Sequence, residues 1–231
     1  MIKIENVVTP SPEQWKALIL GARNAMNSWD RSDSKFYEDV DFDPDDYIRQ
    51  GMYLIGPNDH ELMMRLRNAG TDHRKFMRMI TVYLNITAPL YWWKEFDTYK
   101  VGSVANSCST MHKIHAKEFT MDDFSIEHLS EHSKAYFKEL IDLLNFYRAD
   151  FNNPEVDGDP KNKKFYWWQM IQLLPSSYNQ KRTVMLNYEV LANMYKSRKG
   201  HRLDEWNSLC SWIETLPYSE LITGQSVDKE E

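Results

Sequence analysis

Apolar residues recur along the chain at two spacings, and the two spacings predict a mixture of strands and helices. Alternation with β-branched residues indicates strands, whereas apolar positions three and four residues apart indicate amphipathic helices. Strands are expected at Ile2–Val8, Met79–Thr87 and Tyr178–Leu186. Helices are expected over about 12–26, 59–69, 126–151, 165–174, 188–198 and 201–216, with a further helix starting at Pro89.

Capping signals and polar segments separate these elements. Ser11, followed by Pro12 and Gln14, predicts a capping box at the start of a helix. Asn187 is expected to cap the helix that follows it. Loops are expected at the acidic segment 30–46 and at Asn152–Lys164, and a frayed tail at 223–231.

Size and composition narrow the class of protein. The chain has 231 residues and a mass of 27.5 kDa, which suits one domain over residues 1–231. Its net charge of −6 argues against a nucleic-acid partner, which requires a basic face. No stretch approaches the roughly 20 apolar residues of a membrane span. The two cysteines predict no disulfide framework, and we expect a cytoplasmic protein without a membrane partner.

One segment, Thr87–His115, combines features typical of a ligand site. It begins with a cluster of aromatic residues and continues with small residues between Gly102 and Ser109. Large rings can stack on a flat ligand, and small residues let a ligand approach the backbone closely. The cations Lys100 and Lys113 can meet a phosphate. The segment therefore predicts a site for a flat, anionic ligand.

A second segment supplies two amides and a guanidinium at fixed spacing. Leu174 and Pro175 are followed by Asn187, Asn193 and Arg198. Offsets of six and eleven residues place the last three along a broad stripe of one helix, where they can face one ligand. The alternative interpretation is a helix cap, a buried amide and a surface arginine.

The order and spacing of the two segments resemble the flavin-dependent thymidylate synthase family. That family carries an aromatic-Arg-His-Arg-x7-Ser-x-Arg signature and, later, Leu-Pro followed by Asn-x5-Asn-x4-Arg. The resemblance implies a single α+β domain, with an antiparallel sheet flanked by long helices, in a homotetramer with sites between subunits. It implies methylation of dUMP at C5, with FAD as cofactor and with NADPH and methylenetetrahydrofolate as co-substrates.

The resemblance also assigns roles to individual residues. Arg198 and Ser109 would carry the catalytic contacts. The residues that it places on the pyrimidine nucleotide are Glu95, Lys100, Ser109, Lys113 and Arg198. Those that it places on FAD are His73, Lys100, Asn106, Asn187 and Asn193.

Several positions depart from the family pattern and leave alternatives open. Lys100 is the cation that remains where the family has Arg-His-Arg, and Glu95 stands where a neutral amide is usual. Met111 and Ile171 stand where the family has arginines. A protein that binds a nucleotide without transferring a methyl group is one alternative. A pyrimidine-modifying enzyme with another one-carbon outcome, such as hydroxymethylation, is a second.

Other conspicuous residues are expected to have structural roles. His112 and His115 have no convincing carboxylate or cysteine partner, so no metal site is predicted. Cys108 is interpreted as a small packed residue, with a nucleophile as the alternative. The pair Trp92 and Trp93 is expected to lie mostly in the core or at a subunit interface, because adjacent helical residues diverge by about 100°.

Overall fold

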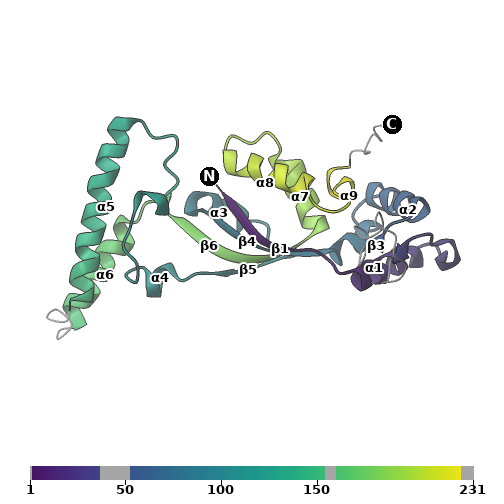
Figure 1. The fold of residues 1–231 in the computed structure, drawn as a ribbon, viewed down its shortest axis with the longest axis horizontal. Coiled ribbons are helices and arrows are strands. Elements are labelled where there is room, and N and C mark those ends of the chain that lie inside the picture. The colour runs from purple at the N-terminus through teal and green to yellow at the C-terminus, as the bar shows by residue number, and fades with distance from the viewer. Residues whose placement is uncertain (1, 37–52, 154–159, 225–231) are drawn as a thin grey trace, which may run out of the picture. The chain divides into compact units, whose positions relative to one another are not determined.

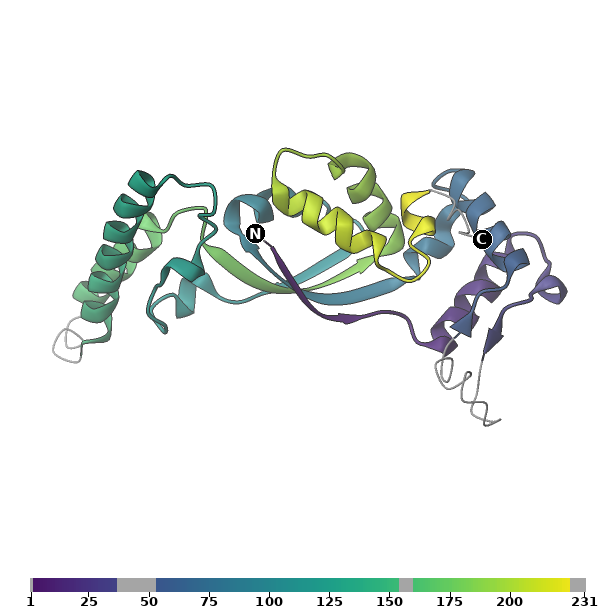
Figure 2. The ribbon, with the colours of Figure 1, turned by 45° about the horizontal axis from the view of Figure 1, so that its top comes forward.

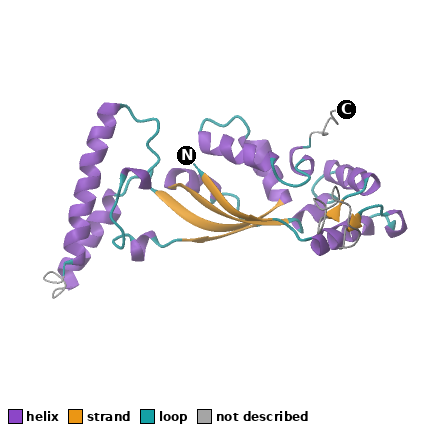
Figure 3. Cartoon of the chain, viewed as in Figure 1, coloured by secondary structure: helices purple, strands orange, loops and turns teal. Residues whose placement is uncertain are grey.

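The computed structural model describes residues 2–36, 53–153 and 160–224. The fold is a single α+β domain with a four-stranded antiparallel sheet in the order β1-β4-β6-β5. Figure 1 labels the helices and strands, and Figure 3 colours them by type. The strands of this sheet are β1 Lys3–Val8, β4 Thr81–Pro89, β5 Ser103–Ser107 and β6 Asn179–Asn187. A second, antiparallel pair joins β2 Lys35–Phe36 to β3 Tyr53–Leu54. The predicted fold class is confirmed.

Helices make up most of the remaining described chain. The α-helices are α1 Pro12–Asn24, α2 Pro57–Asn68, α3 Leu90–Phe96, α4 Thr110–Lys113, α5 Glu131–Asn152, α6 Pro160–Leu173, α7 Tyr188–Arg198, α8 Asp204–Glu214 and α9 Glu220–Thr223. Short 3-10 helices lie at Trp29–Arg31, Arg74–Arg78 and Met121–Asp123. Among the described residues, none of the helices combines the length and apolar composition that a membrane span requires.

The predicted helix caps are confirmed. The Ser11 hydroxyl accepts from the backbone N–H of Gln14 at 3.3 Å, and the Gln14 side chain accepts from the backbone N–H of Ser11 at 2.8 Å. Asn187 caps α7, because its side-chain oxygen accepts from the backbone N–H of Val190 at 2.9 Å. The polar residues that flank the apolar patterns therefore fix where these helices begin.

The structure differs from the sequence prediction at a few elements. Helix α6 begins at Pro160, inside the loop expected up to Lys164, because proline is favoured in the first turn, where its missing N–H costs nothing. Strands β2, β3 and β5 and the short helices α4 and α9 were not predicted. Strand β2 lies within the loop expected over 30–46, and α5 begins at Glu131 rather than near Ile126. Residues 37–46 of the acidic segment and 225–231 of the tail lie outside the described residues.

Contacts along the chain gather into two compact units. The first unit contains Met1–Ile4, Asn85–Thr98 and Ala105–Thr183. The second contains Glu5–Leu84, Tyr99–Val104 and Val184–Glu231. The boundary falls inside all four strands of the main sheet, so each strand contributes to both units.

The first unit has its core around a helical hairpin. Helices α5 and α6 lie side by side, as Figures 1 and 2 show. Its buried apolar cluster consists of Ile114, Phe119, Phe124, Ile141, Leu144 and Met170. Trp92 and Trp93 of α3 are at most 1% exposed, and their rings meet edge to face at 4.9 Å. Trp93 Nε1 also donates to the carbonyl of Gln180 at 3.0 Å, so the tryptophan pair is core, as expected.

The second unit is packed around α7. This helix contacts α8 and α9, while α1 packs against α2. The largest buried side chains of the unit include Trp15, Met63, Met77, Tyr188, Leu191, Trp206 and Ile213. Burial of such side chains stabilises the fold by about 1.5–3 kcal/mol each. Helix α7 is thereby held by apolar contacts on several sides.

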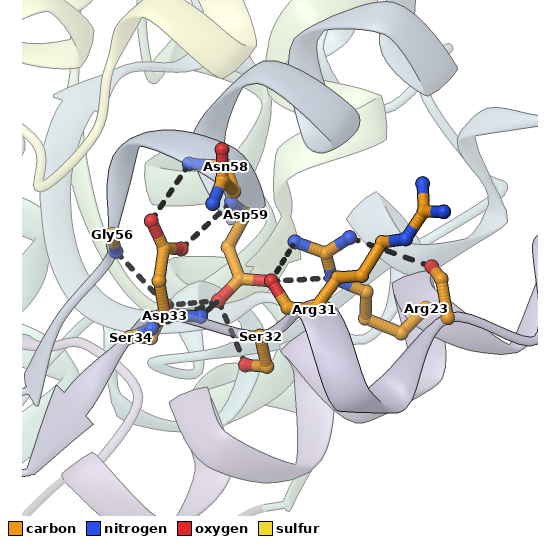
Figure 4. Close-up of polar contacts among 9 residues, drawn as sticks. Arg23, Arg31, Ser32, Asp33, Ser34, Gly56, Asn58 and Asp59 are labelled. Carbon is orange, nitrogen blue, oxygen red and sulfur yellow. Dashed lines mark hydrogen bonds and ion pairs between the residues drawn. The ribbon is translucent and has the colours of Figure 1, made fainter.

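A buried ion pair ties α1 to α2 within the second unit. Arg23 is 4% exposed and Asp59 is 1% exposed, and Arg23 Nε lies 2.6 Å from Asp59 Oδ1 (Figure 4). The other carboxylate oxygen accepts from the hydroxyls of Ser32 and Ser34 at 2.8 and 2.6 Å. It also accepts from the backbone N–H groups of Asp33 and Ser34. One carboxylate therefore anchors the turn after α1 to the first turn of α2.

Candidate functional site

The two signature segments meet at α7 within the second unit. Residues 99–104 and 184–231 belong to this unit, so Lys100, Asn187 and Arg198 share it. Asn193 and His73 belong to it as well. Glu95, Asn106, Ser109 and Lys113 belong to the first unit.

Arg198, at the end of α7, is held by aromatic and polar side chains. Its Nε donates to the hydroxyl of Tyr99 at 2.9 Å, and Nη1 lies 3.1 Å from Nε2 of His201. Its guanidinium carbon lies 4.5 Å from the ring centre of Trp206 and 5.6 Å from that of Tyr99. Contacts of this kind fix the plane of a guanidinium, since its donors point in set directions. The arginine is thus oriented by the protein rather than free to rotate at the surface.

Asn187, at the other end of α7, faces the backbone of the earlier segment. It is 8% exposed, and its amide nitrogen would lie 2.6 Å from a Cβ added at Gly102. Gly102 has a φ of +81°, a conformation that side chains disfavour. The segment from Tyr99 to Gly102 therefore runs past α7 from Arg198 to Asn187. Lys100 lies between these two contacts and is exposed.

Replacing Gly102 with alanine is expected to destabilise the fold and displace the Asn187 amide. The backbone cost of a positive φ is about 1–2 kcal/mol, and the clash with Asn187 adds to it. Urea unfolding measures the loss of stability. Gly200→Ala is the matched control, since Gly200 has a φ of +73° with nothing within 4 Å of an added Cβ. Equal losses for the two variants would contradict the close contact with Asn187.

Asn193 and His73 lie beside an arginine pair that the sequence prediction missed. Arg74 Nη2 donates to the Asn193 side-chain oxygen at 3.3 Å, and Arg74 follows His73 directly in the chain. Both Arg74 and Arg78 bond the carboxylate of Glu189, the first at 3.1 Å. Burial raises the pKa of Glu189, but the bonds from Arg78 and Arg74 outweigh it and hold that pKa below its ordinary value. Arg74, Arg78 and Glu189 together therefore carry one net positive charge.

A sequence signal for this arginine pair does exist. Arg74 and Arg78 are four residues apart, and Glu189 follows the capping Asn187 by two. An acidic residue is typical of the first turn of a helix, and residues four apart share a face of an α-helix, although Arg74–Arg78 itself forms a 3-10 helix, in which residues three apart do so. What the sequence lacks is any indication that the two turns meet in space.

Predicted residues of the first unit cluster near α4. Ser109 caps this short helix, because its hydroxyl accepts from the backbone N–H of His112 at 2.9 Å. Lys113 ends the same helix and is exposed. Asn106 lies exposed on β5, and Glu95 lies half-buried on α3. Ser109 and Lys113 therefore share one turn, whereas Glu95 and Asn106 lie on separate elements.

Two positions at which the resemblance leads one to expect an arginine carry an uncharged side chain, Ile171 and Met111. Ile171 packs against the buried cluster of the first unit, so no charge is placed there. Met111 is 46% exposed, and its carbonyl accepts from Nε1 of Trp167 at 2.8 Å. Trp92 and Trp93 are buried, as expected, and offer no stacking surface to a ligand. The guanidinium of Arg182 lies over Trp93, 4.2 Å from the centre of its ring. Arg182 also pairs with the carboxylate of Asp97 at 2.7 Å.

Cys108 lies between β5 and α4. Cys108 is exposed, so its interpretation as a packed residue is wrong. Its carbonyl accepts from the Gln180 side chain at 3.0 Å, which places it beside β6. Within the described ranges, no group of three or more histidine, cysteine, aspartate and glutamate residues is arranged to hold a metal ion.

Comparison with solved structures identifies the class of fold. Thymidylate Synthase X (ThyX) from Helicobacter pylori with FAD and dUMP is 14% identical, with a TM-score of 0.61 over 97% of this chain and 98% of that chain. A second structure of that enzyme, complexed with FAD and dUMP, is 15% identical, with a TM-score of 0.59 over 96% and 98%. The UMP/dUMP methylase PolB from Streptomyces cacaoi, bound with 5-Br dUMP, is 11% identical, with a TM-score of 0.57 over 97% and 95%.

These likenesses show that the chain has the ThyX-like fold over nearly its whole length. At such low identities they concern the fold alone. No family model matches the chain, and no curated protein matches its sequence.

Proposed function

We propose that the chain binds a pyrimidine nucleotide and FAD and methylates dUMP at C5. The observation that carries the proposal is the run of Tyr99–Gly102 along α7, with Arg198 oriented at one end and Asn187 at the other. The ThyX-like fold supports it, because solved proteins with that fold include enzymes bound to FAD and dUMP. NADPH and methylenetetrahydrofolate are the proposed co-substrates.

Each unit offers its own groups to a nucleotide, cations in both and a hydroxyl in the first. Arg198 would bond the pyrimidine ring, because its plane is already fixed by Tyr99 and Trp206. The Ser109 hydroxyl accepts one backbone bond and can still donate its own hydrogen to a phosphate oxygen. Lys100 in the second unit and Lys113 in the first are both exposed, and either would neutralise a phosphate as a point charge rather than as a bidentate fork.

The residues around Asn193 fit the phosphate part of FAD. Arg74 and Arg78 leave one net positive charge after pairing with Glu189, and His73 and the Asn193 amide lie beside them. Cations and amides are the groups that bond phosphate oxygens. Asn187 would hold the flavin portion. When bound and reduced, FAD supplies electrons for the methylation, and the methylene group comes from the folate.

A second candidate is a nucleotide-binding protein that does not transfer a methyl group. Two observations favour it: the partly buried Ile171 packs against the apolar cluster where the resembled family has an arginine, and Glu189 already pairs with both Arg74 and Arg78. Such a protein would keep the Arg198 contact and lose the reaction. An enzyme with another one-carbon outcome, such as hydroxymethylation, would keep the Arg198 contact and also transfer a one-carbon group.

The absorbance of the purified protein and an isotope assay test the proposal. We expect a flavin spectrum, or a thermal shift on adding FAD, and release of tritium from C5-labelled dUMP in the presence of NADPH and methylenetetrahydrofolate. A colourless protein that responds to dUMP but not to FAD would favour the second candidate. Flavin binding and tritium release with a product other than dTMP would favour the hydroxymethylation alternative.

We also infer that the protein is a homotetramer. Large apolar side chains on the helical hairpin remain at least 39% exposed, namely Tyr136, Leu143 and Phe146 on α5 and Phe165 and Trp168 on α6. Large exposed apolar side chains are typical of subunit interfaces when they gather into one patch. Light scattering should give four times the chain mass of 27.5 kDa. Phe146→Glu is expected to lower it, whereas Val101→Glu, on the second unit, should not; a monomeric wild type would contradict the inference.

A further inference from the structure

A pocket in the second unit lies between the turn after α1 and the N-terminal half of α2. Its volume is about 450 Å³, and none of the described residues in its lining is one proposed for dUMP or FAD. Residues 30–33 line it from the turn, and Asn58, Glu61, Leu62 and Arg65 line it from α2. Offsets of three, four and seven residues place these four on one face of the helix.

Reciprocal hydrogen bonds hold the turn against the helix. The carboxylate of Asp33 accepts from the backbone N–H groups of Asn58 and Asp59 at 3.0 and 3.1 Å. Asp59 in return accepts from the backbone N–H groups of Asp33 and Ser34 at 3.1 and 3.0 Å (Figure 4). The N-terminus of α2 is therefore already occupied by a carboxylate of the protein. The pocket beside it is preformed, so a ligand would order little of the chain on binding.

A buried guanidinium completes the lining. Arg23 is 4% exposed and lines the pocket, and its Nε donates to Asp59 at 2.6 Å. Nη1 donates to the hydroxyl of Ser28 at 3.4 Å, and Nη2 donates to the carbonyl of Arg31 at 3.0 Å. Each of these terminal nitrogens carries a second hydrogen, which has no acceptor among the described residues. Buried donors are normally paired, and a carboxylate in the pocket can supply the acceptor.

Four exposed charged side chains of the lining form no ion pair within the described parts of the chain. These side chains are Asp30, Arg31, Glu61 and Arg65. Glu61 and Arg65 are four residues apart on α2, which is the spacing at which such pairs commonly form. Two acids and two arginines thus leave charge of both signs open around the pocket, with a net charge of zero.

The open charges decide which kind of ligand fits. A ligand with negative charge alone, such as a phosphate, would meet the carboxylates of Asp30 and Glu61. One with positive charge alone would meet the guanidinium groups of Arg31 and Arg65. Contacts between like charges are unfavourable in both cases, whereas a zwitterion can match both signs. The lining therefore favours a ligand that carries an anionic and a cationic group together.

We propose that this pocket binds a free α-amino acid as its zwitterion. The carboxylate would bond the remaining donors of Arg23 and the open arginines, and the ammonium group would meet the open acids. A volume near 450 Å³ lies within the range of about 300–1,000 Å³ that is typical of ligand pockets and leaves room for the side chain. Leu62, which is 3% exposed, offers that side chain an apolar contact. The proposal does not depend on the methylation proposed above.

Saturation-transfer-difference NMR of the full chain tests the proposal. The probes are the proteinogenic L-amino acids, each at millimolar concentration, and we expect at least one to give a saturable signal. The N-acetyl form of that amino acid lacks the ammonium group, and its carboxamide lacks the carboxylate. Each should bind at least about tenfold more weakly, because each loses a charge-assisted contact. Absence of any saturable signal, or equal binding of the N-acetyl form, would overturn the proposal.

Matched variants locate the binding. Arg31→Gln and Glu61→Gln should each weaken binding of the amino acid by about tenfold. Both residues are exposed, so we expect the variants to fold, which circular dichroism checks. Lys16→Gln, exposed on α1 and outside the lining, should leave the affinity unchanged. An affinity that survives both lining variants would place the binding elsewhere and overturn the proposal. Failure of the wild type to bind dUMP would count against the proposed function alone.

Discussion

Asp59→Ala is expected to lower the free energy of unfolding by about 3–5 kcal/mol, the cost of leaving a buried charge without its partner. Arg23 is 4% exposed, so its guanidinium would stay away from water after the carboxylate is removed. The hydroxyls and backbone N–H groups that Asp59 now accepts from would also lose their acceptor. Denaturant unfolding followed by circular dichroism measures the effect.

Asp123→Ala is the matched control for Asp59. Asp123 also accepts several bonds, from Lys117 and from Thr120, but Lys117 is 75% exposed and is hydrated again when the carboxylate is lost. The loss should therefore be about 1 kcal/mol, typical of a removed cap. Similar losses of stability for Asp59→Ala and Asp123→Ala would mean that the burial of Arg23 adds nothing to the cost of removing its carboxylate partner.

The pH dependence of Asp59 gives an independent test. Burial raises its pKa, but bonds from Ser34, Ser32 and Arg23 outweigh that effect, and its folded-state pKa lies below the ordinary value of 3.8. A group with a lowered folded-state pKa stabilises the fold above its unfolded pKa, and that stabilisation is lost as pH falls through the folded pKa. The stability difference between wild type and Asp59→Asn should therefore be constant near neutral pH and shrink below about pH 4. A difference that grows on acidification would contradict this sign.

The sequence was sufficient where local chemistry decides the structure. Ser11 with Gln14, and Asn187 before α7, are caps whose bonds form within a few residues, so their pattern is readable without a fold. The same holds for the alternating strands β4 and β6. The first turn of α6 was not predicted. Pro160 fits that turn, but the residues after it are polar, so apolar spacing does not indicate a helix there.

The candidate site was predictable only in part, because its contacts join distant segments. Spacing placed Asn187 and Arg198 on one helix, but nothing local shows that Gly102 faces the first and Tyr99 the second. The pairing of Arg74 and Arg78 with Glu189 spans more than a hundred residues and was missed for the same reason. Long-range electrostatic partners leave no periodic signal in a sequence.

Arg198→Ala is expected to weaken dUMP binding by about 1.5–3 kcal/mol, a loss of roughly 10- to 150-fold in affinity, if the guanidinium makes a charge-assisted contact with the nucleotide. The size of the loss follows from preorganisation. Tyr99 and Trp206 already fix the plane of the guanidinium, so little entropy is lost when a ligand binds it. Isothermal calorimetry with dUMP measures the affinity.

Two further variants separate charge from geometry at Arg198. Arg198→Lys keeps the charge but loses the planar fork, so it should recover only part of the affinity. Tyr99→Phe keeps the ring and removes the hydroxyl bonded to Arg198 Nε, so a smaller loss is expected, of about 0.5–1.5 kcal/mol. Arg202→Ala is the control, because Arg202 is exposed four residues further on. If Arg198→Ala folds normally and binds dUMP as tightly as Arg202→Ala does, Arg198 lies outside the nucleotide site, and α7 does not carry the substrate contact.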